Sequence, residues 1–187
     1  MMELFNYLEN FLPLSVKSKK AIEGICSSVS MRKNEELQPI DHTCKTIYFI
    51  KSGIARIYYY KDGIDITEYF AFENNIIARA ESLFTGKPSK KAIQVLEDSE
   101  IIAINAPQLF KLYDAHPQIE RLFRLIFEAA YIDTIHRVES IQFCSAKERY
   151  LALLQETELV KRLPLKHIAS YLGITQVSLS RIRASVK

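Results

Sequence analysis

The chain has 187 residues, of which 48% are hydrophobic and 25% charged, and its formal net charge is +3. This length allows one or two domains with a sizeable core, and so small a charge does not by itself indicate a polyanionic partner. No apolar run approaches the ~18 residues of a membrane span and the start of the chain lacks the basic residues of a secretory signal, so we expect a cytoplasmic protein.

Two short helices open the chain. Helical patterns cover Glu3–Leu12 and Val16–Cys26, and Ser15 is a suitable N-cap for the second. From Ser30 to Asn105 the chain is rich in Ile, Tyr, Phe and Val, with turn signals every ten or so residues. This composition predicts an antiparallel roll or barrel.

Turn residues divide this block into strands. The predicted strands are Ile47–Lys51, Ala55–Tyr60, Ile64–Phe72, Lys91–Leu96 and Glu100–Asn105. We expect the first two to form a hairpin around Gly53, and Lys61–Gly63 to turn the chain into the third. Ile76–Lys90 is the least regular stretch, and no element is predicted there.

A long helix is expected next. Pro107 opens a short helix and Pro117 the main one, because proline is tolerated in the first turn. Gln118–Gln142 would span roughly 37 Å at 1.5 Å per residue. Two apolar stripes mark its first half, Ile119, Leu122, Phe123, Ile126 and Ala130 on one and Leu125, Ala129 and Ile132 on the other. One stripe can cover the roll and the other a second copy of the chain, which favours a homodimer; the alternative is a helix buried within one chain.

A boundary follows this helix. Phe143–Ser145 ends it, and Ser145 with Glu148 forms a capping box for a new helix. This pattern predicts a hinge near Cys144, a sensor domain at 1–143 that includes the dimerisation helix at about 117–142, and a C-terminal domain at 144–187.

The segment Leu165–Lys187 has the spacing of a helix-turn-helix. Ile168 and Leu172 are four residues apart, and Leu179 and Ile182 are three apart. Each pair therefore lies on one face of a short helix, and the two faces can pack together.

The turn between these helices has suitable residues. Ala169 permits close approach of the helices, and Gly173 stands where a left-handed backbone is commonly required. Thr175 can cap the second helix. The alternative is a helical hairpin that only packs against the rest of the chain.

Burial of the four apolar residues leaves one polar face on the second helix. This recognition face consists of Gln176, Val177, Ser180 and Arg181. In a major groove, Arg suits guanine, Gln suits adenine and Val suits a thymine methyl, while hydroxyls suit phosphates. The candidate DNA-binding residues are Thr175, Gln176, Val177, Ser178, Ser180, Arg181, Arg183 and Lys166.

Charge is unevenly distributed at this end of the chain. No Asp or Glu follows Glu158, whereas six basic residues do, namely Lys161, Arg162, Lys166, Arg181, Arg183 and Lys187. Such a cluster attracts polyanions, although it could also be a solvated face.

The order of parts resembles the CRP/FNR family of bacterial transcription regulators over essentially the whole chain. Ile168–Thr175 and Leu179–Arg183 carry the specific part of the resemblance, and Tyr48–Arg56 and Asp62–Gly63 support it. The resemblance implies an α+β fold with an antiparallel β-roll of the cyclic-nucleotide-binding type, flanking helices, a long dimerisation helix and a small C-terminal helix-turn-helix domain. It also implies a homodimer that binds double-stranded DNA at a pseudo-palindromic site, with ligand binding in the roll repositioning the dimer helix.

The region of the effector pocket departs from the family. Cyclic-nucleotide binders have a Gly-Glu-Leu turn followed by an Arg-Ser-Ala that holds the cyclic phosphate, whereas this chain lacks the glycine and has Lys90 and Lys91 in place of the arginine and serine. A lysine offers a point charge instead of a planar fork. The candidate pocket residues are Ala80, Glu81, Ser82, Lys90 and Lys91. We expect that cyclic AMP does not bind tightly; the lysines suit another small anionic effector or form a solvated basic loop.

Two further departures concern the family's iron-sulfur sensors and its operators. Three scattered cysteines cannot supply the four ligands of a cluster. Family members often have Arg-Glu where this chain has Gln176 and Val177, so only Arg181 matches, and the operator should differ. The link from Leu154 to Leu165 leaves little room for a β-hairpin wing.

Catalytic and metal-binding patterns are lacking. The cysteines are odd in number and widely spaced, the four histidines show no ligand spacing, and no nucleophile elbow or phosphate-binding glycine loop is present. We therefore expect no cofactor, no metal site and no enzyme.

The sequence thus predicts a homodimeric, sequence-specific DNA-binding transcription regulator with a degenerate or altered effector pocket. The alternative is a cyclic-nucleotide-binding-like module that binds a ligand or a protein but not DNA. The residues do not show whether transcription is raised or lowered, and only an activator would need RNA polymerase as a partner.

Overall fold

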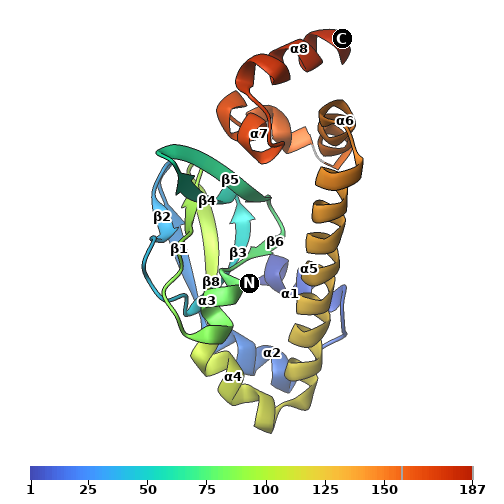
Figure 1. Cartoon of the computed structure of the whole chain (residues 1–187). Helices are drawn as coiled ribbons and strands as arrows, with labels where there is room; N and C mark the ends of the chain where they lie inside the picture. The colour runs from blue at the N-terminus through green and yellow to red at the C-terminus, as the bar shows by residue number, and fades with distance from the viewer. Residues whose placement is uncertain (157, 187) are drawn as a thin grey trace.

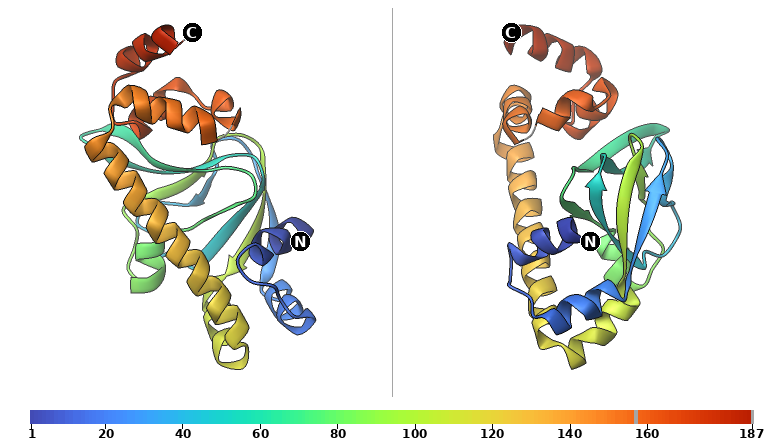
Figure 2. Two further views of the ribbon diagram at one scale, coloured as in Figure 1. Left: turned by 90° about the vertical axis from the view of Figure 1, so that its right-hand side faces the viewer. Right: turned by 180° about the vertical axis from the view of Figure 1, so that it is seen from behind.

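The computed structural model describes residues 1–156 and 158–186. A β-roll carries helices at its lower end, the long helix α5 runs beside it, and the C-terminal helices lie beyond the other end of the roll (Figure 1). Both further views show α5 along the side of the roll and the C-terminal helices above it (Figure 2). None of the described helices is long and apolar enough to cross a membrane.

The two N-terminal helices are shorter than the sequence predicts. Helix α1 spans Met2–Glu9 and α2 spans Val16–Glu23. The Ser15 hydroxyl accepts the Ser18 N–H at 3.1 Å, which confirms the predicted cap. The prediction that α2 reaches Cys26 is wrong, because this residue already pairs within the first strand.

Two four-stranded antiparallel sheets form the roll, in the orders β1-β8-β3-β6 and β2-β7-β4-β5. The strands are β1 (Cys26–Met31), β2 (Glu36–Gln38), β3 (Thr46–Ser52), β4 (Ala55–Lys61), β5 (Ile64–Ala71), β6 (Asn75–Ile77), β7 (Ala92–Val95) and β8 (Ser99–Asn105). All five predicted strands are confirmed. The stretch without a predicted element contains β6 and the short helix α3 (Ala80–Thr85).

The predicted hairpin of β3 with β4 is wrong. Strand β3 pairs with β6 and β8, whereas β4 pairs with β5 and β7, so the chain changes sheets at Gly53. This glycine has φ +99°, and a Cβ built on it would lie 2.1 Å from the Ser99 Oγ. Only glycine lets the chain pass so close to β8 while it crosses between the sheets.

The predicted turn between β4 and β5 is present. Lys61 pairs with Ile64, and the two residues between them, Asp62 and Gly63, have φ of 53° and 75°. Positive φ at both positions is the geometry of the two-residue turn that suits the twist of a hairpin.

The helical layer covers one side of the roll. Helix α4 spans Ala106–Ala115, and α5 spans Pro117–Phe143, each with a proline in its first turn. One predicted stripe of α5 is buried in the main core with α1 and α2, at Ile119, Leu122, Phe123 and Ile126. Ala130, the last residue predicted for that stripe, is instead exposed because α5 has by then passed the main core.

A compact helical unit follows Cys144. The capping box is confirmed, since the Ser145 N–H donates to Glu148 at 2.7 Å and the Glu148 N–H donates to the Ser145 hydroxyl at 3.3 Å. Helix α6 (Ala146–Glu156) and the short 3₁₀ helix Glu158–Arg162 lead to α7 (Leu165–Tyr171) and α8 (Gln176–Val186).

Candidate nucleic-acid interface and effector pocket

The core of the helix-turn-helix forms from the apolar residues that the sequence singles out. Ile168 and Leu172 are 4% and 1% exposed, and Leu179 is completely buried. Ile182 is half-buried against the same cluster. Packing of α7 on α8 therefore decides which side of α8 faces solvent.

The turn between α7 and α8 has the expected backbone geometry. Gly173 has φ +69°, and the Ile174 N–H returns to the Ala169 carbonyl at 3.0 Å, which closes the end of α7. The Thr175 hydroxyl accepts the Ser178 N–H at 3.1 Å and so caps α8.

Every predicted DNA-binding residue is exposed. This holds for Lys166 on α7 and for Thr175, Gln176, Val177, Ser178, Ser180, Arg181 and Arg183 on or before α8. Val177 is 63% exposed and lies beside Gln176 at the start of α8. Helix α8 lies at the end of the molecule farthest from the N-terminal helices, so the roll does not cover the recognition face (Figure 1).

Part of the predicted basic cluster is engaged within the molecule. Arg162 forms ion pairs with Glu73 and Glu97 of the roll, and Lys161 pairs with Glu158. Lys187 lies outside the described residues. Lys166, Arg181 and Arg183 are the exposed cations of α7 and α8, and no acidic residue occurs in either helix.

The five predicted pocket residues lie around α3 and β7. Ala80, Glu81 and Lys90 are exposed. Ser82 is buried, where it accepts the Cys44 N–H at 2.9 Å and donates to the Lys87 carbonyl. Lys91 is directed instead to a carboxylate of β5.

That carboxylate belongs to Glu68, which the sequence analysis did not single out. Its Oε2 lies 2.8 Å from the Lys91 Nζ and 3.6 Å from the Arg79 Nη1. The Arg79 side chain is only 9% exposed, and its Nε donates to the Ser89 hydroxyl at 3.3 Å. Lys91 of the predicted pocket and the neighbouring Arg79 therefore share one anion of the protein itself. In the sequence, the arginine between Ala78 and Ala80 was the signal that a further cation lies near this pocket.

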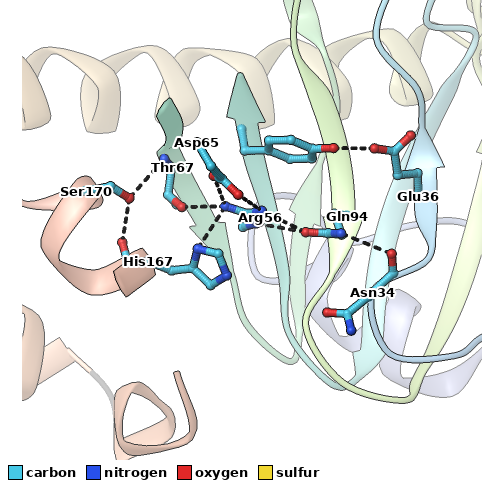
Figure 3. Close-up of polar contacts among 9 residues, drawn as sticks. Asn34, Glu36, Arg56, Asp65, Thr67, Gln94, His167 and Ser170 are labelled. Carbon is cyan, nitrogen blue, oxygen red and sulfur yellow. Dashed lines mark hydrogen bonds and ion pairs between the residues drawn. The ribbon is translucent and has the colours of Figure 1, made fainter. Parts of the chain in front are cut away.

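A second polar cluster joins the roll to α7 (Figure 3). We call it the Arg56 cluster; its members are Arg56, Asp65, Thr67, Gln94, His167 and Ser170. Arg56 is 2% exposed and binds both oxygens of Asp65, at 2.5 and 2.7 Å. Its Nη1 also lies 2.9 Å from the Nδ1 of His167, a residue 111 positions away.

Burial and charge shift the pKa values in this cluster. Burial, together with the nearby Arg56 charge, lowers the pKa of His167 from 6.5 to about 4. Burial acts to raise the pKa of Asp65, but the hydrogen bond and charge of Arg56 outweigh it, so that pKa lies below its usual value. The Arg56 cluster therefore contains a neutral imidazole beside an ionised Arg–Asp pair at neutral pH.

Comparison with known proteins agrees with this architecture. Residues 28–116, from β1 to the end of α4, match the family model "Cyclic nucleotide-binding domain". FixK2 from Bradyrhizobium japonicum superposes with a TM-score of 0.73 at 21% identity, over 87% of this chain and 84% of that one. A putative transcriptional regulator of the CRP/FNR family from Eubacterium rectale superposes with a TM-score of 0.72 at 21% identity, over 96% and 87%. The chain has the CRP/FNR fold.

A third structure with the CRP/FNR fold shows how widely sequences diverge within it. The c-di-GMP-responsive regulator CLP from Xanthomonas campestris superposes with a TM-score of 0.71 at 12% identity, over 92% of this chain and 91% of that one. A comparison with curated proteins gives no significant match.

The long helix of this CRP/FNR fold carries an apolar face that the described residues leave uncovered. Tyr131, Ile135, Val138 and Ile141 follow one another at helical spacing and are 39–67% exposed. Ile132 and Phe143 extend this surface, which we call the α5 apolar face. At its start, Tyr131 borders a hollow of about 420 Å³ that is also lined by Phe84, Phe110 and Phe127.

Proposed function

We propose that the chain is a sequence-specific DNA-binding transcription regulator of the CRP/FNR type. One observation carries this proposal: α8 buries Leu179 against α7 and presents Gln176 and Arg181 to solvent, beside cations that no acidic side chain of the two helices opposes. The solved relatives named as transcription regulators support the same conclusion.

Base recognition would come from the first half of α8. Arg181 can contact both acceptors of a guanine, Gln176 can contact an adenine, and the exposed Val177 suits a thymine methyl. Lys166 and Arg183 would bind phosphates, together with the hydroxyls of α8. Because Gln176 and Val177 differ from the residues common in the family, the operator should differ as well.

The α5 apolar face supports a homodimer. A surface of this size on one helix is costly to leave in water, and a second α5 related by a two-fold axis would cover it with its own copy. Two helix-turn-helix domains would then address half-sites about 34 Å apart, one turn of DNA. The division at Cys144 into a sensor domain (1–143) and a DNA-binding domain (144–187) belongs to this proposal.

The sensor pocket would be altered, and Glu68 is the reason. Its carboxylate pairs with Lys91 of the predicted pocket and with the neighbouring Arg79, two cations that could otherwise attract a phosphate. A bound cyclic nucleotide would have to displace this carboxylate. Weak binding of cyclic AMP follows, while a small anion of another shape remains the class of effector that the lysines suit.

The test of DNA binding is a selection of bound sequences from random duplex DNA, run across a salt series. We expect a pseudo-palindromic operator and an affinity that falls steeply with salt. Arg181→Ala should lose about 1 to 3 kcal/mol at one operator position and relax the choice of base there. Arg32→Ala, which removes an exposed charge from the roll, is the matched control and should leave the selected sequence unchanged. A chain that is only a ligand-binding or protein-binding module would ignore duplexes even at low salt.

A further inference from the structure

Helix α7, the first helix of the helix-turn-helix, lies directly on β5 of the roll. Strand β5 is at the edge of its sheet, and an edge strand leaves backbone N–H groups without a partner strand. The Thr67 N–H points outward from this edge and donates to the Ser170 hydroxyl of α7 at 3.1 Å. Ser170 in turn donates to the His167 carbonyl at 3.1 Å. The Ser170 hydroxyl therefore links the edge of the sheet to the backbone of α7.

The guanidinium of Arg56 reaches across the same contact. Its Nε and Nη2 donate to Gln94, its Nη groups bind Asp65, and Nη1 also lies 2.9 Å from both Thr67 Oγ1 and His167 Nδ1. Figure 3 shows the Arg56 side chain among residues of β5, β7 and α7. The two Nη1 hydrogens thus have three acceptors within reach, Asp65 and Thr67 in the roll and His167 in α7, so the buried cation binds α7 as well as the two strands beside it.

The geometry also determines the form of the imidazole. Arginine only donates, so the Nδ1 of His167 must accept and the ring proton must sit on Nε2. His167 is 6% exposed and cannot exchange this partner for water without leaving the roll. In this hydrogen bond the donor, Arg56, belongs to the roll and the acceptor, His167, belongs to α7.

Apolar packing surrounds the polar contacts. The Phe70 ring of β5 lies 5.0 Å from the Tyr171 ring of α7, and Ile54 and Leu96 of the roll belong to the same buried cluster as Leu172. The covalent link between α5 and α6 consists of only two residues, Cys144 and Ser145. Non-covalent contacts of α7 with the roll, together with the contact of Arg137 of α5 with Tyr171, therefore hold the orientation of the helix-turn-helix.

We propose that Arg56, Thr67, His167 and Ser170 form a latch through which the β-roll holds α7 and thereby fixes the orientation of the recognition face. The latch rests on the proposed DNA-binding function for its purpose, though not for its existence. In a dimer, two latched domains would present both recognition faces in a fixed register, and DNA would not have to order them. Release of the latch would leave each recognition face intact but free its orientation.

Hydrogen exchange of the full chain without DNA tests the latch itself. The variant His167→Phe/Ser170→Ala removes the acceptor for Arg56 and the hydroxyl that bonds the Thr67 N–H, but it keeps α7 apolar enough to pack. Ser185→Ala, at the exposed end of α8, is the control. We expect amides of Ile64–Ala71 to exchange about tenfold or more faster in the double variant, while those of α5 stay protected. His167→Asn, whose side-chain oxygen can replace Nδ1, should retain most of the protection when Ser170 is kept. Unchanged exchange in β5 of the double variant would overturn the latch.

Affinity for full and half operators tests its purpose, once a selection from random DNA has yielded an operator. The double variant should lose affinity for the full operator by on the order of tenfold and keep the wild-type affinity for a single half-site. An unchanged or increased affinity for the full operator would overturn the orienting role. Failure of the wild-type chain to bind any duplex would refute the proposed function, and exchange in β5 would still decide whether the latch exists.

Discussion

Acidification should loosen the contact between the β-roll and α7 before it affects the rest of the roll. The perturbed group is His167, whose Nδ1 accepts a hydrogen bond from Arg56 in a buried site. A protonated imidazole has no acceptor and would place a second positive charge against the guanidinium. Docking therefore requires the neutral ring.

The expected loss follows from the pKa of His167. Above pH 6.5 the ring is neutral whether α7 is docked or not, and the docking free energy is fully present. Between pH 6.5 and about 4 only the undocked or unfolded chain takes up the proton, so stability falls by ~1.4 kcal/mol per pH unit, or about 3 kcal/mol in all. The pKa of Asp65 is lowered from 3.8, so its contribution is lost only in more acidic solution.

Urea unfolding of the wild-type chain and of His167→Asn at about pH 7 and about pH 4.5 measures this loss. The asparagine keeps an acceptor for Arg56 but cannot titrate, and the other histidines, His42, His116 and His136, are common to both proteins. We expect the two proteins to differ in pH dependence by about 2 kcal/mol or more over this interval. Parallel pH dependence of the two proteins would refute the role assigned to the neutral ring.

Three other substitutions test separate parts of the account. Leu179→Ala should destabilise the C-terminal helices by about 2 to 5 kcal/mol, measured by urea unfolding, because the side chain is completely buried; a change below about 0.5 kcal/mol would contradict its place in the core. Glu68→Gln removes the carboxylate that pairs with Arg79 and Lys91, so calorimetry with inorganic phosphate should show tighter binding than in the wild type, whereas Glu100→Gln, at an exposed glutamate of β8, should not change it. Ile135→Glu places a charge in the α5 apolar face and should shift the dimer toward monomer in sedimentation experiments. Lys111→Glu, at an exposed site of α4, should not. A wild-type chain that is monomeric at all concentrations would refute the dimer.

Sequence patterns predicted those features whose causes are local. The left-handed turn at Gly173, the capping box of Ser145 and Glu148 and the burial of Leu179 each depend on residues a few positions apart, and all are confirmed. The same holds for the β4–β5 turn, where two adjacent residues favour positive φ.

Features that depend on distant partners were missed or wrong. Strands β3 and β4 are both largely apolar, and a short link with a glycine suits a hairpin as well as a crossing between sheets. The choice depends on Ser99, which lies far along the chain and leaves room only for a glycine at position 53. Similarly, His167 looks isolated in the sequence, because its partner Arg56 lies 111 positions away, in β4 of the roll.

The candidate pocket illustrates the same limit. Resemblance to the family directs attention to α3 and the lysines after it, but the residue that neutralises Lys91 comes from β5. The sheet order β7-β4-β5 brings Glu68 of β5 to Lys91, which precedes β7, and no spacing in the chain indicates it.

The most direct test of the central claim is the affinity of the purified full chain for duplexes selected from random DNA, measured for the wild type, Arg181→Ala and Arg32→Ala across a salt series. The account predicts a two-fold-related operator, bound in a salt-dependent manner, with selectivity at one base position lost in Arg181→Ala and retained in Arg32→Ala. No enrichment of any sequence, or equal binding by wild type and Arg181→Ala at every operator position, would contradict it.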